Sequence, residues 1–90
     1  MGAYVNVNYP VVIRHGDEGF HARVPAFEIN VKGADIDEAM ELAQAVIEMT
    51  AQFMFDDHEL VPGPVNDSMI PLGQGEELRH ILASVPKWID

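Results

Sequence analysis

Residues 5–13 alternate between apolar and polar side chains, and this alternation limits the possible fold more than any other feature of the chain. The odd positions are all apolar, namely Val5, Val7, Tyr9, Val11 and Ile13. The even positions include Asn6 and Asn8. A period of two is that of a β-strand with one buried face. The sequence therefore predicts a half-buried strand that needs both a sheet and a covering layer.

Two more strands are predicted directly after it. Residues 15–19 (HGDEG) are polar and glycine-bearing, as expected of a turn. Residues 20–24 alternate again, with His21 and Arg23 at the polar positions, and Pro25 ends that run. Residues 27–32 alternate as a third strand that ends at Gly33. The three strands form a predicted antiparallel meander with one apolar face.

A long helix is predicted to cover that face. Asp35 suits the N-cap position, and Glu38, three residues later, can complete a capping box. The helical spacing continues to about Phe55. The predicted core stripe is Ile36, Ala39, Met40, Ala43, Val46, Ile47, Thr50, Phe53 and Met54. Leu42 and Met49 lie beside this stripe and widen the apolar arc, which indicates a second contact surface.

The remaining residues predict two further elements. Two prolines in residues 60–65 favour an extended segment, and residues 69–72 (MIPL) are predicted to form a short edge strand. Residues 78–85 have i, i+3, i+4, i+7 apolar spacing, which predicts a short amphipathic helix ended by Pro86. The predicted fold class is therefore α+β: a three-stranded antiparallel meander packed on one long helix (β-β-β-α), then a short edge strand and a short C-terminal helix. We expect residues 1–66 to form the domain and residues 67–90 an extension, either part of the same fold or an oligomer contact.

The composition excludes several classes of function. Fifteen acidic and five basic residues give a net charge of −10, which repels nucleic acid, so direct DNA binding by this chain is not expected. The chain has no cysteine and its N-terminus has no signal-peptide pattern. We expect a cytoplasmic protein without a membrane span. The same negative charge would accelerate encounters with a basic protein partner.

No set of residues predicts catalysis, a metal site or a cofactor. The four histidines share no ligand spacing. Most of the carboxylates around Asp35 belong to one helix start, where capping and the helix dipole explain them. We therefore predict no catalytic residues, no metal ligands and no cofactor, and we do not expect the chain to be an enzyme.

Two groups of residues are candidates for contacts with other molecules. The first is a polar recognition face for a partner protein, predicted from His21, Arg23, Glu28 and Asn30. An ordinary solvated strand face is the alternative for these residues. The second group is predicted to make subunit contacts in a homodimer or higher homo-oligomer, or to dock on its own domain: Leu42, Met49, Leu78, Ile81, Leu82 and Trp88.

The order and spacing of several short motifs resemble the HicB family of antitoxins. The matching segments are residues 9–13 (YPVVI), 17–20 (DEGF), 24–25 (VP), 37–43 (DEAMELA), 45–47 (AVI) and 62–64 (PGP), together with Ala22 and Gly33. The resemblance covers about residues 4–66. It implies a partial RNase H-like fold. Between the second and third strands, however, the chain lacks the second proline and the glycine that family members usually carry.

The resemblance also implies a function. A HicB-like protein would be an antitoxin that binds a small basic HicA-type mRNA interferase and covers its RNA-binding surface. The acidity of the chain suits such a partner. The alternative is an orphan HicB-like oligomeric domain that has no toxin and binds another protein or a small ligand.

Overall fold

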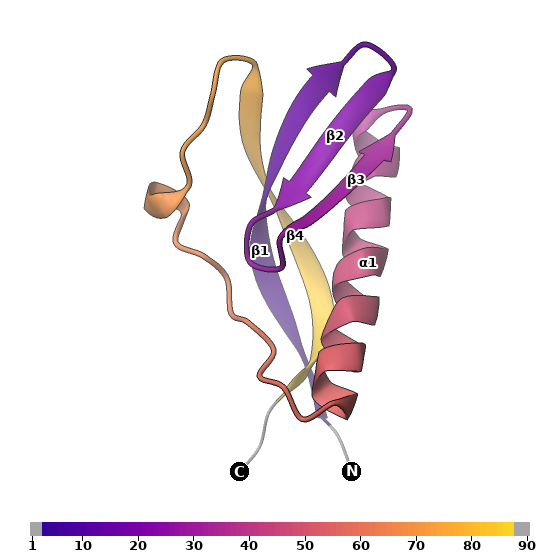
Figure 1. Cartoon of the computed structure of the whole chain (residues 1–90), viewed down its shortest axis with the longest axis vertical. Coiled ribbons are helices and arrows are strands. Elements are labelled where there is room, and N and C mark those ends of the chain that lie inside the picture. The colour runs from indigo at the N-terminus through magenta and orange to yellow at the C-terminus, as the bar shows by residue number, and fades with distance from the viewer. Residues whose placement is uncertain (1–2, 88–90) are drawn as a thin grey trace.

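The computed structural model describes residues 3–87 as one antiparallel sheet covered on one face by one long helix (Figure 1). The elements are β1 (Ala3–Gly16), β2 (Gly19–Val24), β3 (Ile29–Gly33), α1 (Ile36–Asp56), a 3-10 helix η1 (Asp67–Met69) and β4 (Glu76–Lys87). The strand order is β3-β2-β1-β4. The α+β class and the β-β-β-α order are as predicted. None of the helices in these residues has the length and hydrophobicity that a bilayer span requires.

The meander forms where the alternation predicts it. The two-residue turn 17–18 joins β1 to β2, and the register pairs Val12 with Arg23. Strand β1 is longer than the predicted 5–13 because β4 pairs with it along almost its whole length. Strand β3 begins at Ile29 rather than at Phe27. The reason is that Glu28 has φ 55, a turn conformation that interrupts the extended run. Phe27 instead packs edge-to-face on Tyr9, with ring centroids 5.1 Å apart.

Small side chains let α1 pack closely on the sheet. Its fully buried residues recur every fourth position: Ala39, Ala43, Ile47 and Ala51. The helix start also fits against Gly33, where an added Cβ would lie 2.4 Å from the backbone nitrogen of Ala39. Asp35 caps the helix as predicted, since its Oδ1 accepts from the Glu38 N–H at 2.8 Å. The Glu38 carboxylate accepts from the Ala34 N–H at 3.0 Å.

The predictions for the last third of the chain are wrong in two respects. Residues 78–85 lie within the 12-residue strand β4, not in a helix. The same segment also contains the alternating residues Ile81, Ala83 and Val85, and pairing with β1 from Ala3↔Lys87 to Arg14↔Glu76 selects the strand. The predicted edge strand at 69–72 is absent. Asn66 instead caps η1 through its side chain, and residues 70–72 lie outside the sheet.

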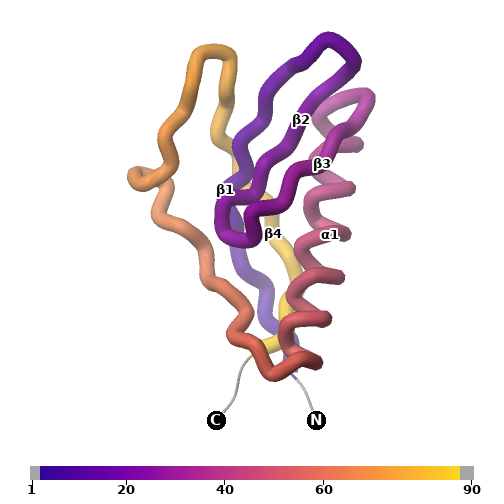
Figure 2. Tube along the Cα trace, viewed as in Figure 1, coloured from indigo at the N-terminus to yellow at the C-terminus, as the bar shows by residue number. Residues whose placement is uncertain are grey.

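Residues 57–75 reverse the direction that β4 would otherwise have. Helix α1 runs back along the sheet from the end of β3, so a short connection would make the last strand parallel to β1. The long connection instead returns along the other side of the sheet, which makes β4 antiparallel (Figures 1 and 2). Two contacts hold it there. The Tyr9 hydroxyl donates to the Pro62 carbonyl at 2.7 Å, and a His80 ring nitrogen lies 2.7 Å from an Asp67 carboxylate oxygen.

The outer edge of β4 is partly covered by α1. The backbone N–H of Ser84 points away from β1 and donates to the Glu48 carboxylate at 2.7 Å. Every second residue of an antiparallel strand shares this outward orientation. Pro86, two residues after Ser84, therefore lies at a position whose N–H would not pair with β1, so the missing N–H of proline costs no hydrogen bond there. Pro10, opposite His80, is tolerated for the same reason, because β2 does not pair with β1 at this position. The Glu48 side chain and Pro86 together reduce the number of exposed, unpaired N–H groups along the outer edge of β4.

Helix α1 ends in a Schellman motif whose left-handed residue is His58, with φ 61. The Glu59 N–H donates to Met54 and the His58 N–H to Phe55. Glycine adopts this conformation without a Cβ penalty. We expect His58→Gly to raise the free energy of unfolding by about 0.5–1 kcal/mol in urea titrations, whereas His58→Ala gives no comparable gain. Equal effects of the two substitutions would contradict this account.

The buried hydroxyl of Tyr9 predicts a pH dependence. Burial raises the pKa of Tyr9 above its ordinary value of 10.0. The folded state therefore holds this proton more tightly than the unfolded chain, and the resulting stability is complete below pH 10 and lost as the pH rises through the folded pKa. Tyr9→Phe should cost about 1 kcal/mol at neutral pH through the lost hydrogen bond to Pro62.

The measurement is urea unfolding of wild type and Tyr9→Phe across a pH series that passes 10. The difference between the two proteins should narrow at the alkaline end. Tyr4→Phe, at a position 59% exposed, controls for the loss of a tyrosine hydroxyl and should cost less at neutral pH. A wild-type advantage over Tyr9→Phe that stays constant above pH 10 would show that the phenol does not titrate in the way that burial requires.

Candidate functional site

Three of the four predicted partner-binding residues lie together on the face of the sheet opposite α1. The register pairs His21 with Arg14 and Lys32, and Arg23 with Asn30. Directly paired residues point to the same side of a sheet. Alternation places the core residues of the same strands on the α1 side, so these five point away from the helix. We call them the polar face: Arg14, His21, Arg23, Asn30 and Lys32.

Glu28, the fourth predicted residue, does not join this face. It lies in the turn between β2 and β3, where its N–H donates to the Pro25 carbonyl at 3.3 Å. The turn is at the opposite end of β2 from the β1–β2 turn. Alternation alone assigned Glu28 to a strand, and its left-handed backbone conformation is what removes it from the sheet.

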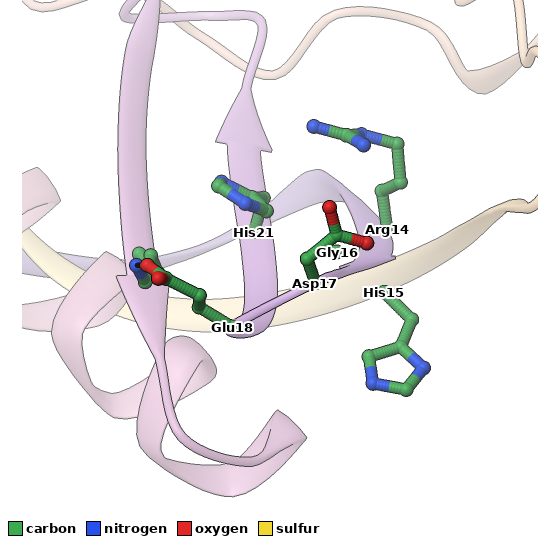
Figure 3. Close-up of a pocket in the computed structure, with 7 residues that line it drawn as sticks. Arg14, His15, Gly16, Asp17, Glu18 and His21 are labelled. Carbon is green, nitrogen blue, oxygen red and sulfur yellow. Dashed lines mark hydrogen bonds and ion pairs between the residues drawn. The ribbon is translucent and has the colours of Figure 1, made fainter.

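An open hollow of about 450 Å³ adjoins the polar face at the β1–β2 turn. Figure 3 shows Arg14, Asp17 and His21 around it, whereas the His15 ring lies on the other side of β1. His15 instead stacks on Phe20, with centroids 4.4 Å apart. The residues lining the hollow are Arg14, His15, Gly16, Asp17, Glu18, His21 and Lys32. The hollow is therefore shallow, polar and open to solvent.

The polar face brings cations and carboxylates together, because Glu76 pairs with Arg14 and points to the same side, and Asp17 and Glu18 line the hollow. It holds three of the chain's five basic side chains, Arg14, Arg23 and Lys32. Lys32 lies 3.1 Å from Glu18, and Arg23 lies 4.0 Å from Glu76. Arg14 is in no ion pair within residues 3–87. Because exposed ion pairs are weak, these cations stay available to another molecule. The cations of this face can therefore take a carboxylate or phosphate of another molecule.

The carboxylates at the start of α1 have structural partners. Asp35 and Glu38 accept the backbone hydrogen bonds of the helix cap. Within the part of the chain that the structure describes, no three His, Asp or Glu side chains are grouped so that they could hold a metal ion. The expectation that the chain has no catalytic residues and no cofactor stays a prediction.

The residues predicted to make oligomer contacts divide into exposed and buried ones. Leu42, Met49 and Leu82 are 41%, 53% and 55% exposed. Leu78 is half-buried. Ile81 is only 7% exposed, because as part of β4 it pairs with Tyr9 and faces the core, so it packs within its own domain and has little surface for a contact between subunits. Trp88 lies outside the described residues.

One exposed residue was assigned to the wrong group by the sequence analysis. Phe53, predicted in the core stripe, is 60% exposed on α1. The buried stripe has strict four-residue spacing, so Phe53 lies beside Met49, four residues earlier, and not beside Ala51. The spacing of seven and four residues between Leu42, Met49 and Phe53 could have indicated from the sequence that Phe53 lies on the same exposed side of the helix. The hydrogen bond between Glu48 and Ser84 could not be predicted from the sequence, because it forms only when residues 76–87 are a strand.

Comparisons with known proteins identify no relative of this chain: no family model matches the sequence, and neither does any curated protein.

Two glycines of the β1–β2 hairpin lie so close to other parts of the chain that an added Cβ would meet them. At Gly19, with φ 140, an added Cβ would lie 2.4 Å from the Gly33 carbonyl oxygen, which is rigid backbone. At Gly16 an added Cβ would meet the His21 ring at 2.9 Å, and that ring can rotate away. We expect Gly19→Ala to cost more than about 2 kcal/mol of stability and Gly16→Ala about 1 kcal/mol or less.

Urea unfolding measures the two stabilities, and the NMR signals of the His21 ring report its position. Gly16→Ala should shift the His21 signals while those of His80 stay unchanged. If Gly16→Ala left the His21 signals in place, the packing of this ring on Gly16 would be refuted.

Proposed function

We propose that this chain is a non-catalytic, antitoxin-like binding protein that neutralises a small basic HicA-type mRNA interferase by covering its RNA-binding surface. The HicB-like order of motifs over residues 4–66 supports the proposal. The β-β-β-α order is compatible with it. The protein would act in the cytoplasm as a homodimer or higher homo-oligomer, without a cofactor.

The observation that carries the proposal is the uncompensated negative charge. The chain has fifteen acidic residues against five basic ones. Within residues 3–87 only four carboxylates lie in ion pairs, those of Glu18, Asp67, Glu76 and Glu77. The other described carboxylates have no cationic partner. Such a surface attracts a basic RNase over the range of the Debye length and competes with RNA for its cationic groups.

A second candidate is supported by the polar face. Three cations gather there beside an open hollow, and Arg14 is in no ion pair within residues 3–87. This arrangement suits an anionic ligand or the acidic segment of another protein. It favours an orphan HicB-like domain that has no cognate toxin.

The test is to purify the chain with the small basic protein encoded next to it and to measure mass by light scattering after size exclusion. We expect a stable complex that stops RNA cleavage by the partner. The association rate should fall as salt shortens the Debye length from about 30 Å at 0.01 M to about 8 Å at 0.15 M. An unchanged mass together with undiminished RNA cleavage would reject the antitoxin function and leave the orphan domain.

A further inference from the structure

Three large apolar side chains of α1 form a stripe on the outside of the molecule. Leu42, Met49 and Phe53 are 41%, 53% and 60% exposed. At 3.6 residues per turn they lie within about 40° of one another around the helix axis. We call them the outer stripe. It is separate from the buried stripe that runs through Ala43 and Ile47 and faces the sheet.

Nothing in residues 3–87 covers the outer stripe. The sheet lies on one side of α1, and the connection 57–75 runs on the far side of the sheet (Figures 1 and 2). Side contacts of the helix, such as that of Glu48 with the Ser84 N–H, are directed at β4. A contiguous row of large apolar side chains that folding leaves exposed is typical of an interaction site.

The charges around the stripe determine which partner it suits. Helix α1 carries five acidic side chains and no basic one: Asp37, Glu38, Glu41, Glu48 and Asp56. None of them forms an ion pair within the described part of the chain. Glu38, Glu48 and Asp56 accept hydrogen bonds only from neutral N–H groups, so each keeps an uncompensated negative charge. A second copy of the chain would bring these carboxylates against its own.

We infer that the outer stripe is the docking surface for a basic amphipathic segment of another protein, whose apolar side packs on Leu42, Met49 and Phe53. Lysine or arginine residues beside its apolar positions meet the carboxylates of α1. This is recognition of an amphipathic element by an apolar surface with complementary charge at its rim. The inference rests on the proposed function, because it names the surface through which a basic toxin would be held.

The probe is a labelled amphipathic peptide with leucine at helical spacing and lysine elsewhere, and its affinity is measured by fluorescence anisotropy. The double variant Met49→Gln, Phe53→Gln removes apolar area without changing charge, and glutamine is at least as good a helix former as methionine or phenylalanine. Met69→Gln is the matched control, since Met69 is 73% exposed but lies in η1. We expect the double variant to weaken binding at least about tenfold and the control to change it less than about twofold.

A peptide with glutamate in place of lysine should not bind. Unchanged unfolding midpoints would show that the exposed substitutions leave the fold intact. If the double variant bound the lysine peptide as tightly as wild type does, the docking surface would be refuted. Light scattering of the free protein tests the other occupant, because a dimer that the double variant dissociates would assign the stripe to self-association and overturn the inference.

The same variants separate this inference from the proposed function. If the neighbouring basic protein binds wild type and the double variant equally, the antitoxin function stands and the stripe is not its surface. If that protein does not bind wild type but peptide binding still depends on the stripe, the docking surface stands and the proposed partner is wrong.

Discussion

The pairing of β1 with β4 is the interaction on which the rest of the structure depends. Register pairs run from Ala3↔Lys87 to Arg14↔Glu76, so β4 accompanies β1 almost from end to end. The meander alone could not support so long a strand, because β2 pairs with β1 only from Val12 onward. Without β4, the first half of β1 would leave its backbone groups unpaired on both sides. Residues far apart in the sequence thus complete the central strand.

This pairing also positions the helix. Strand β4 contributes Ile81, Ala83 and Val85 to the core, beside Tyr9 and Val11 of β1. Helix α1 covers this surface with alanine at three of its four fully buried positions, so its backbone can approach the sheet closely. The larger apolar residues of α1 therefore lie beside the buried stripe or on the solvent-exposed side of the helix. The narrow buried stripe and the exposed outer stripe therefore have a common cause, which is a helix that packs through small side chains.

Features that depend on interactions between residues near one another in the sequence were predictable, and features that depend on distant residues were not. The meander, the Asp35 cap and the start of α1 were predictable because alternation and capping are local. Three residues of the polar face were predictable for the same reason. Strand β4 was not, because residues 78–85 satisfy helical spacing and only the unpaired half of β1 selects a strand. Glu28 was expected in a strand but lies in the turn between β2 and β3. Ile81 was expected on a helix but is buried as part of β4. Phe53 was expected in the core but is exposed, because the buried stripe of α1 is narrower than the apolar side of the helix.

The fold distributes the two signs of charge unevenly. Three of the five basic side chains lie on the sheet face away from α1, whereas α1 carries five acidic residues and no basic one. A net charge of −10 therefore understates how asymmetric the surface is. A basic partner approaching the sheet meets Arg14 and Arg23, whereas the charged side chains of α1 itself are all carboxylates, beside the outer stripe. Electrostatic steering depends on this local field and orients the encounter before contact. The predicted recognition residues His21 and Arg23 lie on the face away from α1, so the basic partner that we propose is expected at the helix, and an anionic group at the polar face.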